Sequence, residues 1–122
     1  NRTGVRADCA DCHVAKGLAG RLAHKARLAN EVWLNWQGVI ATPERYAARR
    51  HALVQRVWAR MEADGSQACK TCHSHAAMAA HEQSPEAAAM MKWAVGKGSH
   101  TCISCHKGVS HTLPPAWVED AE

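Results

Sequence analysis

All six cysteines of this chain fall into one pattern, C-x-x-C-H, which occurs three times. The copies consist of Cys9, Cys12 and His13, of Cys69, Cys72 and His73, and of Cys102, Cys105 and His106. On a helical turn, positions i, i+3 and i+4 share one face, so two thiols and an imidazole can act on the same group. The pattern is typical of c-type haem attachment, in which the thiols bond the vinyl groups of a porphyrin and the histidine ligates its iron. The sequence therefore predicts three covalently bound haem c groups.

Other uses of paired cysteines fit this pattern less well. Structural zinc takes four ligands in a tetrahedral site, and six cysteines with three obligatory histidines do not divide naturally into such sites. A disulfide framework does not require a histidine after each pair. A redox-active dithiol normally occurs once, in a thioredoxin-like setting. Haem attachment is the interpretation that uses every cysteine and every adjacent histidine.

The composition indicates an interior that side chains alone do not fill. The 122 residues include five Trp and one Tyr but no Phe, and alanine is abundant while leucine and isoleucine are few. Three haems would supply the missing apolar volume. The formal net charge is +4, and about six haem propionates would offer partners to the basic residues. The charge therefore does not indicate a nucleic-acid partner.

The elements that must position the motifs are helices. Apolar residues after the first motif recur at spacings of four and three, which places them on one face. They are Leu22, Ala26, Ala29, Trp33, Trp36 and Ile40. A second helix is expected from Thr42-Pro43, an N-cap followed by a proline, to about Asp64, with Gly65 as its stop. The two helices would form an antiparallel hairpin between the first and second motifs.

A third helix is expected between the second and third motifs, from Ser84-Pro85 to the stretch between Gly96 and Gly98. No strand pattern competes. The predicted fold class is all-α, a small multihaem cytochrome c with few helices packed around three haems. We expect one triple-haem domain over residues 1–118 and a disordered acidic tail over 119–122. Trp33, Trp36, Trp58 and Trp93 are expected on helices, packed against porphyrin or a neighbouring helix.

No stretch reaches the roughly 18–20 apolar residues of a membrane span, so none is predicted in this chain. The first residues, which include no initiator methionine, read like the middle of a protein, and we expect a processed or truncated piece. Because cytochromes of this type acquire haem outside the cytoplasmic membrane, the predicted compartment is the bacterial periplasm.

With these motifs in place, the chain closely resembles the NapC/NirT/NrfH family of membrane-anchored tetrahaem quinol dehydrogenases. The matching segments are residues 1–7, 9–14, 41–46, 58–61, 66–67, 87–90 and 101–114. The resemblance implies electron transfer from membrane quinol to periplasmic reductases. The family begins with a membrane helix and a first C-x-x-C-H haem that this sequence does not contain. We therefore expect the counterparts of haems two, three and four, which relay electrons without oxidising quinol.

The resemblance also implies iron ligands beyond the motifs. His111 matches the histidine that ligates the haem of the preceding motif, here the haem on Cys69 and Cys72. For the haem on Cys9 and Cys12, Met91 stands where the family has a histidine, with Lys92 or His100 as alternatives. The family's sixth ligand for the haem on Cys102 and Cys105 lies before the first residue of this sequence. Another histidine, another subunit or an open iron are the three alternatives there.

The predicted function is electron transfer rather than enzymatic catalysis. The donor would be a quinol-oxidising membrane partner or another cytochrome, and the acceptor a periplasmic oxidoreductase. One alternative is a reductase of small molecules such as nitrite or hydroxylamine at an open haem. Another is a fixed haem subunit of a larger respiratory or photosynthetic complex.

Overall fold

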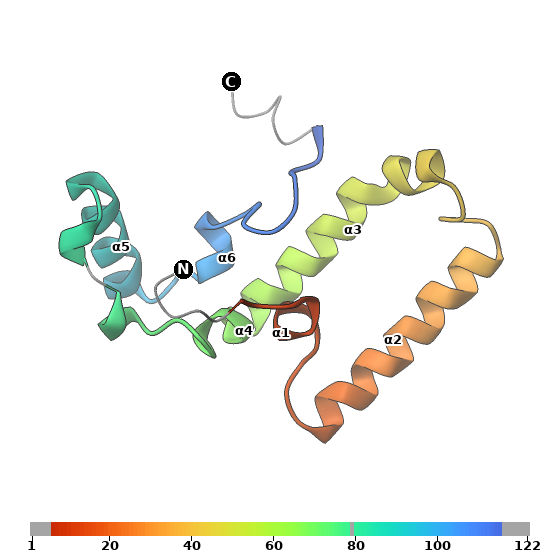
Figure 1. Ribbon diagram of the computed structural model, residues 1–122, viewed down its shortest axis with the longest axis horizontal. Helices are drawn as coiled ribbons and strands as arrows, with labels where there is room; N and C mark the ends of the chain where they lie inside the picture. The colour runs from red at the N-terminus through yellow and green to blue at the C-terminus, as the bar shows by residue number, and fades with distance from the viewer. Residues whose placement is uncertain (1–5, 79, 116–122) are drawn as a thin grey trace. The chain divides into compact units, whose positions relative to one another are not determined.

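The computed structural model describes residues 6–78 and 80–115, and all its regular elements there are helices. The elements, in chain order, are α1 (Cys9–His13), α2 (Leu18–Trp36), α3 (Pro43–Ala63), α4 (Gln67–Lys70), the 3₁₀ turns η1 (His75–Ala77) and η2 (Ala80–Glu82), α5 (Pro85–Lys97) and α6 (Cys102–Cys105). No strand occurs among the described residues, so the prediction of an all-α fold is confirmed (Figure 1). The tail at 119–122 lies outside the described residues.

The chain forms two compact units, Asn1–Leu53 and Val54–Glu122. The first contains α1, α2 and the beginning of α3. The second contains the rest of α3 and everything that follows it, including the second and third C-x-x-C-H motifs. The expectation of a single domain over 1–118 stays a prediction.

Helix α2 ends earlier than its apolar pattern predicts, because Gly38 stops it. Gly38 takes a φ of 75°, which is in the left-handed region. The amide of Val39 donates to the carbonyl of Leu34 at 2.9 Å, and that of Gly38 to Asn35 at 2.9 Å, which is a Schellman motif. The prediction that Ile40 continues the helical face was therefore wrong, since it lies in the turn before α3. The chain reverses direction there, as expected of a hairpin (Figure 1).

Helix α3 begins and ends as the sequence predicts. Thr42 Oγ1 accepts from the amide of Arg45 at 3.3 Å, and Pro43 is the first helical residue. The side chain of Arg45 closes the preceding turn, because its Nη1 donates to the carbonyl of Gly38 at 2.6 Å. After Ala63, Gly65 turns left-handed at a φ of 68°. Its amide donates to Glu62 at 3.0 Å, and the amide of Ser66 donates to Met61 at 2.6 Å.

Helix α5 also matches its prediction at both ends. Ser84 Oγ accepts from the amide of Ala87 at 3.2 Å, Pro85 opens the helix, and Gly98 ends it with a φ of 64°. These signals could be predicted because each cap involves neighbours within a few residues.

Very few described side chains are buried. Only Ser66, Ile103 and Pro114 fall into the buried class among the residues that the structure describes. On the predicted apolar face of α2, Leu22, Trp33 and Trp36 are 57%, 52% and 75% exposed. The side chains therefore leave broad apolar faces that a large apolar group could cover. Within the described part of the chain, no helix has the length and apolar character needed to cross a membrane.

Candidate functional site

The first C-x-x-C-H motif is itself a short helix, α1, with a reciprocal cap. The carboxylate of Asp8 accepts from the amide of Asp11 at 3.0 Å, and the carboxylate of Asp11 accepts from the amide of Asp8 at 3.1 Å. Lys16 Nζ lies 3.4 Å from Asp11 Oδ1. The amide of Asp8 and then the ammonium of Lys16 hold the pKa of the Asp11 carboxyl below its ordinary value. Asp11, the second residue between the two cysteines, thus keeps the motif helical.

The second and third motifs close in the same way as each other. The amide of His73 donates to the carbonyl of Cys69 at 2.9 Å, and the amide of His106 donates to the carbonyl of Cys102 at 2.9 Å. An i to i−4 bond of this kind is the α-helical one, and it places the histidine on the same face as the first cysteine. Helices α4 and α6 are only four residues long. Each motif nevertheless forms a helical turn that includes the amide of its histidine.

None of the six cysteines forms a disulfide, and none is buried. Cys9, Cys12, Cys72 and Cys105 are exposed, while Cys69 and Cys102 are partly buried. The motif histidines His13, His73 and His106 are exposed as well. The described residues contain no cluster of three or more His, Cys, Asp or Glu side chains that could hold a metal ion. The thiols of each pair are thus not tied up in disulfides.

A buried serine joins the second motif to the third. Ser66 Oγ accepts a hydrogen bond from the amide of Ile103 at 3.1 Å, across 37 positions of sequence. A second long-range contact joins the residues that flank these motifs. Lys107 Nζ lies 4.9 Å from the centre of the Trp58 ring. Trp58 belongs to α3, which precedes the second motif, and Lys107 directly follows His106. The first motif lies in the other compact unit, Asn1–Leu53.

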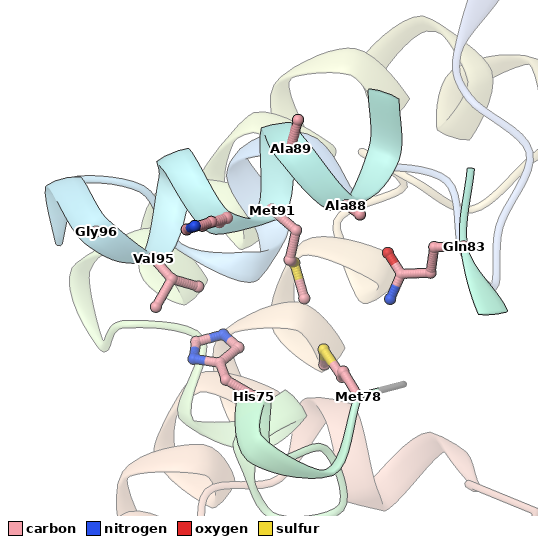
Figure 2. Close-up of a pocket in the computed structure, with 9 residues that line it drawn as sticks. His75, Met78, Gln83, Ala88, Ala89, Met91, Val95 and Gly96 are labelled. Carbon is pink, nitrogen blue, oxygen red and sulfur yellow. The ribbon is translucent and has the colours of Figure 1, made fainter. Parts of the chain in front are cut away.

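A cavity of about 530 Å³ opens beside α5 in the second unit. It is lined by His75, Met78, Gln83, Ala88, Ala89, Met91, Lys92, Val95 and Gly96. Figure 2 shows the thioether of Met91 entering this space from α5, while the His75 ring and the Met78 side chain enter it from the segment around η1. Met91 and Lys92, two of the three ligand candidates for the first haem, thus line one cavity.

Sequence reasoning did not single out His75 and Met78. The one signal available was proximity, since His75 stands two residues after His73 and Met78 three further on. The third ligand candidate, His100, has a different neighbour. Its ring centre lies 4.8 Å from that of Trp93, with the planes tilted by 34°.

His111 lies in a tight loop after the third motif and is exposed. Gly108 begins this loop with a φ of 79°, and a Cβ there would stand 3.2 Å from the side chain of Leu113. Only a glycine fits the close return of the chain without strain. His111 therefore lies in a loop whose first turn requires the glycine at position 108.

The residues present fit haem c on two grounds. Each motif offers two thiols that form no disulfide and an imidazole on one helical turn, which is the donor set that c-type attachment requires. The wide exposure of Leu22, Trp33, Trp36 and Trp93 gives apolar surface of the kind that porphyrin faces cover. Zinc or disulfide chemistry would not account for these apolar surfaces.

Comparison with known proteins gives one consistent result. The chain is 46% identical over 114 residues to a protein of Allochromatium vinosum named putative tetraheme cytochrome-c type, with 93% of the chain and 61% of that protein covered. It is 40% identical over 122 residues to the denitrification system component NirT of Stutzerimonas stutzeri, covering 100% of the chain and 60% of the relative. It is 42% identical over 115 residues to the cytochrome c-type protein TorC of Escherichia coli, covering 93% of the chain and 29% of TorC.

The chain thus spans between 29% and 61% of the length of these three relatives. No solved structure matches it significantly. Residues 1–116 match the family described as NapC/NirT cytochrome c family, N-terminal region. The three C-x-x-C-H turns and these similarities over nearly the whole sequence lead to one conclusion: the chain belongs to the NapC/NirT family of c-type cytochromes.

Proposed function

We propose that this chain carries three covalently attached haems and relays electrons between redox proteins in the periplasm. The single observation that carries the proposal is that all six cysteines lie in three C-x-x-C-H segments folded as helical turns. Membership of the NapC/NirT family supports it independently.

Each motif has the parts needed to attach one haem. The thiols of Cys9 and Cys12, Cys69 and Cys72, and Cys102 and Cys105 would each add across a vinyl group, so that sulfur bonds carbon and the thiol hydrogen moves to the neighbouring carbon. His13, His73 and His106 would ligate the irons from the same turns. Ligand and anchors come from one short segment, so each group is fixed before distant residues contribute.

When bound, haem c supplies a reversible couple between ferric and ferrous iron. The chain's own residues then orient the rings, exclude water and set the axial ligands, which tune the potential. Nothing in this task requires a general acid, a general base or a substrate pocket. The proposed role is therefore that of a carrier, not of an enzyme.

The family resemblance supports Met91 as an axial ligand, since Met91 stands where the family has a ligating histidine. Its thioether enters the cavity beside α5 in the company of the Met78 side chain and the His75 imidazole (Figure 2). We propose Met91 for the haem on Cys9 and Cys12, and His111 for the haem on Cys69 and Cys72. A thioether in place of an imidazole raises a haem's reduction potential, so the Met91 haem would be the easier one to reduce.

The proposed partners follow from the relatives. A quinol-oxidising membrane protein or another cytochrome would donate electrons, and a periplasmic oxidoreductase would accept them. NirT is named a denitrification system component, which fits a respiratory acceptor for this chain as well. A fixed place in a larger respiratory complex is compatible with the same role.

Protein-film voltammetry of natively matured protein tests the proposal. Three one-electron couples are expected, with no catalytic current after nitrite or hydroxylamine is added. A catalytic current with either compound would show that an iron is open to substrate and would overturn the carrier assignment. Fewer than three couples would contradict the proposed haem count.

A further inference from the structure

Ser66 combines two features that are rarely found together in a non-glycine residue. Its side chain is fully buried, at 0% exposure, in a chain whose described side chains are mostly exposed. Its backbone is left-handed, with a φ of 56° and a ψ of 42°. Among the described non-glycine residues it alone has a positive φ. A side chain makes this conformation costly, and glycine would avoid the cost. The serine hydroxyl should therefore serve a purpose that glycine could not.

The polar atoms of Ser66 reach both motifs of the second unit. Its carbonyl accepts from the amide of Cys69, the first cysteine of the second motif, at 3.1 Å. Its Oγ accepts at 3.1 Å from the amide of Ile103, which lies between the two cysteines of the third motif. The hydroxyl also lies 3.4 Å from the carbonyl of Met61, to which it donates. The hydroxyl thus both donates and accepts a hydrogen bond.

Local capping does not explain the serine. Ser66 stands at the N-cap position of α4, where a serine normally caps its own helix, but its side chain makes no such bond. The carboxylate of Asp64 instead accepts from the amide of Gln67 at 3.2 Å. The Ser66 hydroxyl is directed at α6. There it satisfies the second amide of a helix, a group that has no partner within the helix.

Ile103 makes this bond consequential. It is 7% exposed, so its amide has little access to water that could replace a lost partner. Two nearby amides have other partners: the amide of Thr101, two residues earlier, donates to Ser104 Oγ at 3.2 Å, and the amide of Ser104 donates to the carbonyl of Thr101 at 3.1 Å. The Ser66 hydroxyl therefore joins the third turn to the start of the second, and Lys107, which follows the third turn, also contacts Trp58 of α3.

We infer that Ser66 is a positioning residue that fixes the attachment turns of the second and third motifs relative to one another. Because each turn would anchor its haem at two thioethers and one ligand, fixing the turns fixes the separation and tilt of the two rings. That the turns carry haems rests on the proposed function. The hydrogen bond between Ser66 and Ile103 does not depend on it.

The test compares Ser66→Ala and Ser66→Gly with Ser99→Ala in matured protein. Ser66→Ala removes the hydroxyl and keeps the backbone strain, whereas Ser66→Gly removes both and is the safer variant for folding. Ser99 is an exposed serine of the same unit and serves as the control. Hydrogen exchange of the Ile103 amide, followed by NMR in the reduced protein, should be about tenfold faster in both Ser66 variants. It should be unchanged in Ser99→Ala.

The second readout is magnetic coupling between the two irons in the electron paramagnetic resonance spectrum of the oxidised protein. The wild-type coupling should be lost or shifted in both Ser66 variants and kept in the control. Unchanged exchange at Ile103 would overturn the contact whether or not haem is bound. Faster exchange with unchanged coupling would overturn the positioning role. Absence of haem from these cysteines would instead defeat the proposed function and leave the exchange result standing.

Discussion

The amide nitrogen of His106 lies 2.9 Å from the carbonyl oxygen of Cys102, and His73 stands in the same relation to Cys69 at 2.9 Å. This bond closes each motif into one turn, so the spacing of three and four residues becomes a shared face. Two segments 33 positions apart in the sequence thus have the same local closure. That repetition is expected if both segments have the same chemical task.

Removing one pair of thiols should remove one haem. The double variant Cys69→Ala, Cys72→Ala is expected to lose about one third of the haem absorbance per polypeptide, because each turn would attach its ring independently. The corresponding variant at Cys102 and Cys105 should lose the same share. A pyridine haemochrome assay measures both. Unaltered absorbance in either variant would contradict attachment at that motif.

Replacing Met91 should move one reduction potential and leave the others nearly unchanged. Met91→His is expected to lower the potential of a single haem, because imidazole stabilises the ferric state more than a thioether does. Redox titration followed by optical spectroscopy measures the change. Met90→Ala is the matched control, since Met90 adjoins Met91 on α5 but is 60% exposed and does not line the cavity. Equal potentials in Met91→His and wild type would exclude Met91 as a ligand.

The cap of the first motif should weaken in acid. The pKa of Asp11 is lowered in the folded state by the Asp8 amide and by Lys16. A lowered carboxyl pKa contributes stability above the unfolded value of about 4, and that contribution is lost as the pH falls through the folded value. The carboxyl carbon of Asp11 should therefore titrate by NMR with a pKa below the ordinary value of an aspartate.

Lys16→Met tests the cause of that shift. It should move the titration midpoint of Asp11 part of the way back, because the amide of Asp8 remains. In Asp11→Asn, the part of the pH response of α1 that depends on the Asp11 carboxyl should be lost. A wild-type midpoint at or above the ordinary value would show that the cap does not hold the carboxylate.

Gly38→Ala should destabilise the turn between α2 and α3 by about 1–2 kcal/mol, because its φ of 75° is left-handed. A Cβ there would also approach Arg45 Nη1 at 2.9 Å, although a flexible side chain can move away. Gly38→Asn introduces the same Cβ but tolerates the conformation better, so it should lose less. Denaturant titration measures both free energies of unfolding. Equal losses would mean that crowding, not backbone conformation, requires the glycine.

The sequence predicts those features of the molecule that are local. The caps at Thr42 and Ser84 and the stop at Gly98 were confirmed because each depends on neighbours within four residues. The prediction that the helical face continues through Ile40 was wrong because Gly38, in a left-handed conformation, ends α2 at Trp36 although the apolar spacing continues. The bond between Ser66 and Ile103 could not be predicted, since it joins positions 37 residues apart and depends on tertiary packing. The convergence of His75 and Met78 on the Met91 cavity is likewise tertiary.

The most direct test is intact mass spectrometry of the protein produced in its native compartment and denatured before measurement, so that only covalent adducts survive. A mass equal to the polypeptide plus three haems is predicted, with peptide mapping that places one adduct on each cysteine pair. A colourless polypeptide at its unmodified mass would contradict the account entirely.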